Sequence, residues 1–283
     1  MPPRSHPTAR QARLGAELRK LRERAGITGG EAAAFLGGER ALVSHIESGR
    51  YGVSAERVRR LAAFYSATDR ALVDALATMA EDRRKGWWTD FRGILHPSFL
   101  DLAELEYHAS WMRTIQMLHI PGQFQTEEYA FSVFGGAVTE VPRRELEARV
   151  EHRLRRQQIF DRPTPPAFEA LVHEAALRIC YGERKAMRTQ LDRLLEATDM
   201  PSVTIRVIPF TAEKLTGSAH SMLYAGGPIP PLDTVQVDSA FGGTFLDAEA
   251  QLAKYRALAE SVKAVSLDAD ESRDIIHRIA QEM

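Results

Sequence analysis

Cysteine is almost absent from this sequence, since Cys180 is the only one in 283 residues. A single cysteine excludes an internal disulfide and any zinc site built from several cysteines. Long apolar runs are missing as well, and none approaches the roughly 18 residues that a membrane-spanning helix needs. Residues 1–10 are polar and proline-containing, without the apolar core of a secretion signal. These absences predict a cytoplasmic protein with no membrane partner.

Net charge is also low, at −1, but it is unevenly distributed. Residues 1–66 contain 12 Lys and Arg against 6 Asp and Glu, a net of +6 that leaves −7 for the rest of the chain. A basic N-terminal segment followed by an acidic chain is typical of a nucleic-acid-binding module joined to a domain of another function. With 44 % hydrophobic residues, the chain can bury a core and is long enough for two domains.

Signatures of catalysis are few. The sequence contains no phosphate-binding loop, dinucleotide fingerprint or nucleophile elbow. Residues 173–177 nearly match a zinc-protease helix, but the second histidine, needed four residues after His173, is replaced by Leu177. Cys180 lies among apolar residues at helical spacing, which favours a buried core thiol over a nucleophile. We therefore expect no enzymatic activity, no metal site and no cofactor.

The N-terminal part shows helix patterns in close succession. Apolar spacing, caps and glycine stops predict helices over residues 13–25, 30–36, 39–47, 55–65 and 69–84. Two helices that cross over a short turn need a small residue where they touch, a glycine in the turn and apolar anchors on the second helix. Ala33, Gly37, Val43 and Ile46 fill these places. An unrelated helical bundle is the alternative, but it does not require this spacing.

Three motifs carry a family resemblance, and they are Leu18-Arg19-Lys20-Leu21-Arg22, Ala25-Gly26-Ile27-Thr28 and Val43-Ser44-His45-Ile46-Glu47-Ser48-Gly49-Arg50. With them, residues 13–66 resemble the Xre, or phage-repressor, family of helix-turn-helix domains. The resemblance implies that the third helix enters the major groove of double-stranded DNA. It also implies a structural ion pair between Arg22 and Glu47.

The implied DNA-binding residues are Thr28, Gly29, Glu39, Arg40, Ala41, Ser44, His45 and Arg50. Arg40 can pair two-pronged with a guanine and Glu39 can accept from a cytosine, unless both are simply solvated. Arg50 and the backbone at the start of the second helix are candidate phosphate contacts. Where the family often has a glutamine, this chain has Gly29-Gly30, so only backbone amides could hold a phosphate there. A homodimer on a palindromic operator is therefore expected.

We place a domain boundary near residue 85, after a disordered tail over residues 1–12 and a DNA-binding domain over residues 13–84. Residues 85–283 then form a domain for dimerisation and for binding a ligand or partner. Helices are expected over residues 101–118, 143–160, 174–180, 245–264 and 268–281, with another beginning at Thr126. Short strands are expected over residues 167–172, 203–208, 221–225 and 234–237. The whole chain is thus mainly α, with a C-terminal α+β domain that has a small sheet.

Two features of this larger domain leave alternatives open. Arg149, Arg153 and Arg156 could form a nucleic-acid stripe, but the glutamates between them favour an ordinary solvated helix face. Core packing explains five aromatic residues that could also line a ligand site, and for the Trp87-Trp88 pair a plug at a domain interface is favoured over a pocket. The five are Trp88, Trp111, Phe124, Tyr129 and Tyr181.

Further motifs lie at Pro121-Gly122-Gln123-Phe124-Gln125-Thr126, Tyr129-Ala130, Arg153 to Gln157, Glu174-Ala175-Ala176-Leu177 and Val203 to Pro209. With them, residues 90–280 resemble the C-terminal domain of WhiJ-type actinobacterial regulators, which are described as antitoxin-like. Together the two resemblances imply a homodimeric transcription regulator, a repressor, whose C-terminal domain senses a small-molecule effector or a small partner protein. The alternative is an interaction protein that sequesters a small partner and autoregulates its operon.

Overall fold

The computed structural model describes residues 7–82, 84–136, 140–215, 220–239 and 242–283. The chain divides into two compact units, Met1–Trp87 and Trp88–Met283, so the observed division lies three residues beyond the expected one. Within the described ranges, no helix is long and apolar enough to cross a membrane.

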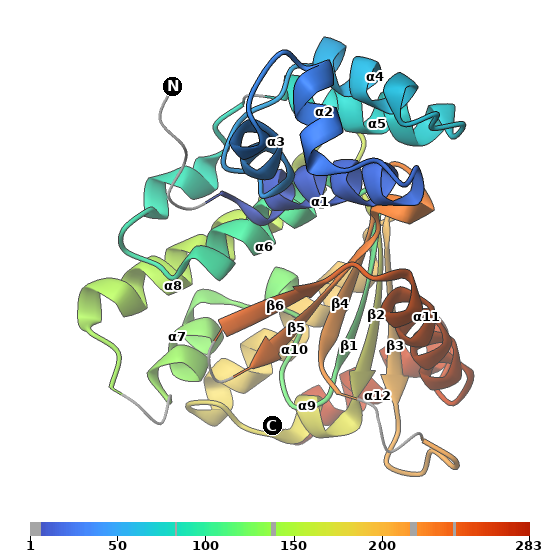
Figure 1. The fold of residues 1–283 in the computed structure, drawn as a ribbon. Coiled ribbons are helices and arrows are strands. Elements are labelled where there is room, and N and C mark those ends of the chain that lie inside the picture. The colour runs from blue at the N-terminus through green and yellow to red at the C-terminus, as the bar shows by residue number, and fades with distance from the viewer. Residues whose placement is uncertain (1–6, 83, 137–139, 216–219, 240–241) are drawn as a thin grey trace. The chain divides into compact units, whose positions relative to one another are not determined.

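The first unit is helical (Figure 1), and its helices are α1 (Ala9–Arg24), α2 (Gly29–Phe35), α3 (Arg40–Glu47), α4 (Ala55–Phe64) and α5 (Arg70–Glu81). Side-chain caps explain where most of them begin, because Thr8, Thr28, Ser54 and Asp69 each accept a hydrogen bond from a backbone N–H of the first turn. The small core is made of apolar side chains at helical spacing, among them Leu18, Val43, Ile46, Val58, Leu61 and Leu76.

The disordered tail expected over residues 1–12 is wrong for residues 9–12, because α1 already begins at Ala9, while residues 1–6 lie outside the described residues. Thr8 and Gln11 form a reciprocal capping box that starts the helix. The first turn also packs closely on Gly49, where a Cβ atom would lie 2.8 Å from the Ala12 nitrogen. Tertiary contact therefore extends the helix over a segment whose composition is typical of a tail.

The second unit combines a sheet with helices. Its helices are α6 (Pro97–His108), α7 (Glu127–Gly135), α8 (Arg143–Arg156), α9 (Glu174–Arg178), α10 (Arg184–Thr198), α11 (Glu249–Ala264) and α12 (Ala269–Glu282). Its strands are β1 (Trp111–Gln116), β2 (Ala167–His173), β3 (Val203–Ile208), β4 (Met222–Gly226), β5 (Thr234–Ser239) and β6 (Gly242–Leu246). They form one six-stranded sheet in the order β3-β2-β1-β4-β5-β6. The first three strands are parallel and β4 to β6 are antiparallel.

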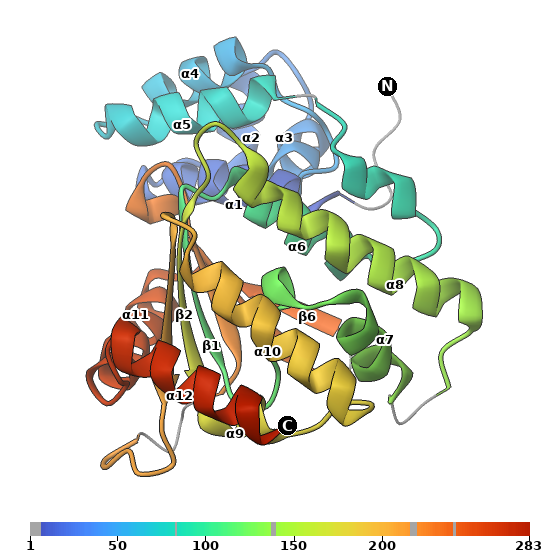
Figure 2. The ribbon, with the colours of Figure 1, turned by 180° about the vertical axis from the view of Figure 1, so that it is seen from behind.

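Helices cover both faces of this sheet. On one face lie α10 and α12 (Figure 2). They pack on β1, β2 and β3 around a cluster that includes Met112, Phe168, Leu191 and Ile276. On the other face, α11 packs around Ile115 and Val262. The mainly helical fold with a C-terminal α+β domain is thus confirmed, although the sheet has six strands rather than the four that were predicted.

Three segments differ from the sequence-based expectation. The single helix predicted over residues 101–118 is wrong, since α6 ends at His108 and Trp111–Gln116 is the central strand β1. Met112 and Ile115 belong to opposite clusters of the sheet, and a strand buried on both faces lacks the alternation that reveals a strand. The helix expected from Phe245 begins only at Glu249, after β6, and α10 was not anticipated.

Candidate nucleic-acid interface

The outer face of α3 carries the residues expected to read DNA. Val43 and Ile46 turn into the core, whereas Glu39, Arg40, Ala41 and Ser44 are exposed. Within the described parts of the chain, no hydrogen bond or ion pair engages the Glu39, Arg40 or Ser44 side chains. The N-terminal half of α3 therefore presents polar groups that an external partner can use.

The other two predicted contacts near α3 lie differently. His45 is half-buried, and its ring packs on that of Tyr51 with centroids 4.8 Å apart. Arg50 is exposed just beyond Gly49, which holds a positive φ of 72°. His45 thus contributes partly to packing, while Arg50 remains open to solvent.

Arg40 lies against the start of α2. A Cβ atom on Gly29 would meet the Arg40 Cγ at 3.9 Å and its Nε at 4.0 Å. Arg40 thus lies beside the N-terminus of α2, which carries partial positive charge, although the first turn of α2 also holds the Glu31 carboxylate.

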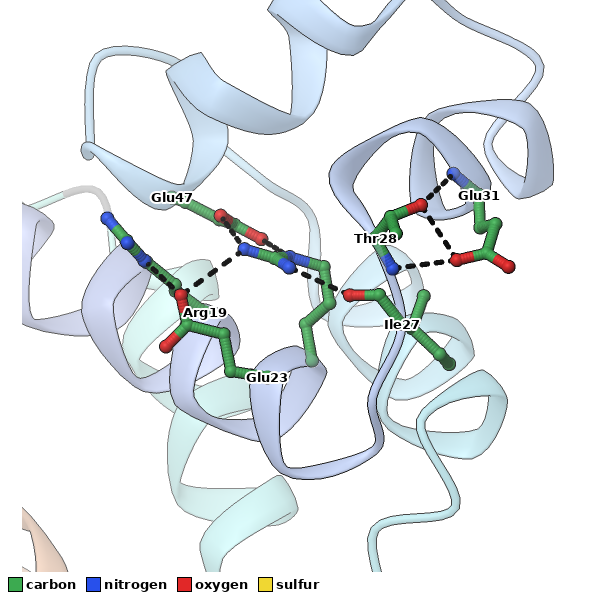
Figure 3. Close-up of polar contacts among 7 residues, drawn as sticks. Arg19, Glu23, Ile27, Thr28, Glu31 and Glu47 are labelled. Carbon is green, nitrogen blue, oxygen red and sulfur yellow. Dashed lines mark hydrogen bonds and ion pairs between the residues drawn. The ribbon is translucent and has the colours of Figure 1, made fainter.

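The capping arrangement at Thr28 changes the expected phosphate site. The Glu31 carboxylate accepts from the Thr28 amide and from its hydroxyl, both at 2.7 Å (Figure 3). The Thr28 hydroxyl in turn accepts from the Glu31 amide at 3.2 Å. These hydrogen bonds from Thr28 lower the pKa of Glu31, so a carboxylate occupies the position where we expected a phosphate. A DNA phosphate at Thr28 and Gly29 would have to displace it.

Arg22 and Glu47 fix the end of α3. The Arg22 Nε and Nη2 donate to the two Glu47 oxygens at 2.6 and 2.9 Å, and Nη1 donates to the Ile27 carbonyl at 2.8 Å (Figure 3). The structure therefore brings the expected pair together and ties it to the loop before α2. The hydrogen bond to Glu47 raises the pKa of Arg22, and burial raises the pKa of nearby Tyr65 to about 12.

Gly15, which was not singled out in the sequence, lets α1 approach α3. A Cβ atom there would lie 2.5 Å from the Glu47 carbonyl oxygen and 2.6 Å from that of Ile46. No side chain fits at such distances, so glycine is required for this crossing. A glycine inside a helical pattern was the available signal, because it often marks a close backbone approach.

The five aromatic residues of the larger domain do not form one group. Phe124 and Tyr129 are fully buried in the core cluster, and half-buried Tyr181 packs against it. Trp111 stacks on Tyr224 with ring centroids 5.2 Å apart, and buried Trp88 meets Tyr107 at 5.1 Å. Packing therefore accounts for Phe124 and Tyr129.

The residues weighed for catalysis lie in and after α9. The His173 Nδ1 accepts from the Ala175 amide at 3.1 Å and so caps α9, while Glu174 accepts from Arg178 at 2.8 Å and from the Phe210 amide at 3.0 Å. Cys180 is exposed, and the expectation of a buried core thiol is therefore wrong. Helix α9 ends at Arg178, which leaves the cysteine in the loop that follows.

Comparison with known proteins supports a two-part chain. A helix-turn-helix domain model matches residues 13–76, and a model described as a domain of unknown function (DUF5753) matches residues 99–278. The second match covers more than half of the chain. The chain belongs to the DUF5753 family. No curated protein and no solved structure matches it. This DUF5753 protein also carries a DNA-binding helix-turn-helix domain.

In this DUF5753 protein, the Pro121–Thr126 loop and the end of α8 meet. The Gln125 side chain accepts from Arg153 Nη1, and the Gln125 carbonyl accepts from Gln157, both at 2.6 Å. Arg156 is buried against Glu106, so the expectation that the arginine stripe is a solvated face is wrong for its C-terminal end. Arg149 pairs with Glu145 on the same helix, as an ordinary helix face would, but its side chain is only 22 % exposed.

Proposed function

We propose that the chain is a transcription regulator of the Xre type, a repressor, that binds a palindromic operator as a homodimer and reads bases through α3. The observation that carries the proposal is the exposed row of Glu39, Arg40, Ala41 and Ser44 on a helix whose other face is anchored in the core. A recognition helix must combine a fixed backbone with free polar side chains at its N-terminal end.

We propose that the second unit binds an effector. Trp88–Met283 is a separate compact unit of nearly two hundred residues, and it has no implied role in contacting bases. Such a unit fits the effector-binding part of a regulator. Its effector would shift the affinity for DNA through a coupling of about 1–3 kcal/mol.

The test is binding of the full chain to DNA from its own promoter, measured by fluorescence anisotropy across a salt series. Loss of a bidentate base contact in Arg40→Ala should weaken specific binding about 5- to 150-fold while nonspecific binding changes little. Arg70→Ala is the matched control, since Arg70 is equally exposed but lies at the start of α5. Arg50→Ala should instead weaken all sequences and reduce the salt slope by about 1. Equal losses in Arg40→Ala and Arg70→Ala would contradict the assignment of α3.

An antitoxin-like role is the second candidate. Leu118 and Phe210 are 51 % and 60 % exposed, and they follow β1 and β3 at the carboxyl edge of the parallel strands. Exposed apolar side chains at one edge are suited to a protein partner. Stoichiometric co-purification of a small protein from the native host, lost in Phe210→Ser, would favour this role.

A further inference from the structure

Arg153 of α8 is held in an unusual environment. Its Nη1 donates to the neutral side-chain oxygen of Gln125 at 2.6 Å, and its guanidinium carbon lies 4.2 Å from the ring centroid of Phe134. The Nε atom is sealed from solvent and has no hydrogen-bond partner. The side chain as a whole is half-buried, so Nη2 is the donor that an incoming group can reach.

No carboxylate of the described residues forms a direct ion pair with Arg153. Its neighbour Arg156 takes both oxygens of buried Glu106, at 2.5 and 2.8 Å. Among the described residues, no acidic group lies within ion-pair distance of Arg153. Burial and then repulsion from Arg156 lower the pKa of Arg153 to about 9, so the site as it stands disfavours the positive charge. Arg156 thus holds the one buried carboxylate, and Asp238 and Glu106 act on the charge of Arg153 only from beyond ion-pair distance.

Arg149, one turn earlier on the same helix, shows the ordinary arrangement. Its guanidinium also lies over aromatic rings, 5.4 Å from the Phe99 centroid and 5.9 Å from that of Phe134. However, it donates two hydrogen bonds to Glu145, at 2.6 and 3.1 Å. The same helix therefore provides a carboxylate for Arg149 and none for Arg153.

The surroundings of Arg153 are suited to a small anion. The turn at Gly122 passes close to both guanidiniums, since a Cβ atom there would lie 3.4 Å from Arg156 Nη1 and 3.6 Å from Arg153 Nε. His119, whose pKa is lowered by burial and by the charge of Arg153, stacks on Tyr181 at 4.8 Å. Its neutral form adds no competing charge, and the two rings provide an apolar surface nearby.

We infer that Arg153 binds the carboxylate or phosphate group of a small-molecule effector, which supplies the missing counter-charge between α7, α8 and the Pro121–Thr126 loop. The inference rests on the proposed sensing role and names the chemistry of the effector. A guanidinium with free donors is the side chain best suited to a planar or tetrahedral anion. The aromatic rings nearby favour an effector with an apolar body.

The test titrates the full chain with benzoate, with its neutral analogue benzamide and with inorganic phosphate, using calorimetry in a buffer free of other polyvalent anions. We expect saturable binding of benzoate or phosphate below about 10 mM and none of benzamide. Binding of benzoate alone identifies a carboxylate effector, and binding of phosphate alone identifies a phosphorylated one.

Three variants make the test specific. Arg153→Gln keeps a donor for Gln125 but removes the charge, and should weaken anion binding about tenfold or more. If Arg153→Gln does not fold, Arg153→Lys takes its place in the test. This variant keeps the charge but loses the planar guanidinium, and should bind the anion more weakly than wild type. Arg149→Gln, the matched control, should bind as wild type does.

Absence of anion binding to the wild-type chain, or equal affinity in wild type and Arg153→Gln, overturns the inference. Because the titration contains no DNA, its result is independent of operator binding. A chain that binds anions through Arg153 but ignores its promoter would refute the proposed regulator and leave the anion site standing.

Discussion

Replacing Glu47 by glutamine tests the pair that holds α3 in place. The two side chains are mostly buried, with 12 % of Arg22 and 11 % of Glu47 exposed. Breaking a buried pair by removing one partner costs about 3–5 kcal/mol, and the residual exposure places Glu47→Gln near the lower limit. The charge left on Arg22 would keep the Ile27 carbonyl and a neutral amide as close acceptors, with the half-exposed Glu23 carboxylate 3.7 Å away.

Glu23→Gln is the matched control for this change. Glu23 also accepts from an arginine of α1, Arg19 (Figure 3). The side chains of this pair are 62 % and 50 % exposed. Exposed pairs contribute roughly 0.2–1 kcal/mol, so Glu23→Gln should hardly alter stability. A double-mutant cycle with Arg22→Gln should give a coupling energy of about 2 kcal/mol for the Arg22–Glu47 pair.

The assay must report on the first unit alone, because a chain of two units need not unfold in one step. Residues 13–76 contain no tryptophan, so tryptophan fluorescence does not follow their unfolding. Hydrogen exchange of peptides from α1 and α3 reports on this unit directly, and a loss of 3 kcal/mol corresponds to exchange about 150-fold faster. Equal exchange rates in Glu47→Gln and Glu23→Gln would refute the anchoring role of the pair.

Three further predictions follow from the same geometry. Gly15→Ala should destabilise the first unit by about 1–3 kcal/mol, because its Cβ atom would lie 2.5 Å from a carbonyl oxygen, and unchanged hydrogen exchange would contradict this close approach. Glu31→Gln should strengthen DNA binding at low salt by removing a carboxylate from the start of α2; weaker binding would show that the cap matters more than the repulsion. Burial lowers the pKa of His152 to about 3, whereas in the unfolded chain it is about 6.5. Between these two values only the unfolded chain takes the proton. At pH 5 the free energy of unfolding of the larger unit should therefore be about 2 kcal/mol lower than at neutral pH. The urea midpoint of wild type should therefore fall from pH 7 to pH 5, and that of His152→Gln should fall by less. An equal fall in both proteins would exclude protonation of His152 as the cause.

Local signals in the sequence predicted the first unit well. The helices begin at side chains that cap them, as Thr28 does for α2, and such signals depend on residues three or four positions apart. The turn glycines are equally local, since Gly37 and Gly49 hold positive φ values that other residues rarely adopt. Even there, the start of α1 was missed, because its capping box lies in a segment whose composition resembles a tail.

The candidate sites needed more than local signals. The Arg22–Glu47 contact spans 25 positions and was expected only from a family resemblance. For Arg153 and Arg156, the glutamates along α8 indicated a solvated face, whereas their actual partners, Gln125 and Glu106, come from other segments. Sequence spacing on one helix does not show which face another segment covers.

The sequence by itself determined where most helices of the first unit begin and end, which residues face outward on α3, and that the chain has a basic front and an acidic remainder. These properties depend on neighbouring residues and on composition. Only the tertiary structure decided that Trp111–Gln116 is a central strand, that Glu31 occupies the start of α2, and that Arg153 lacks a carboxylate. Each of these depends on what distant segments place around a residue, because burial and counter-charge are fixed only when the whole chain has packed.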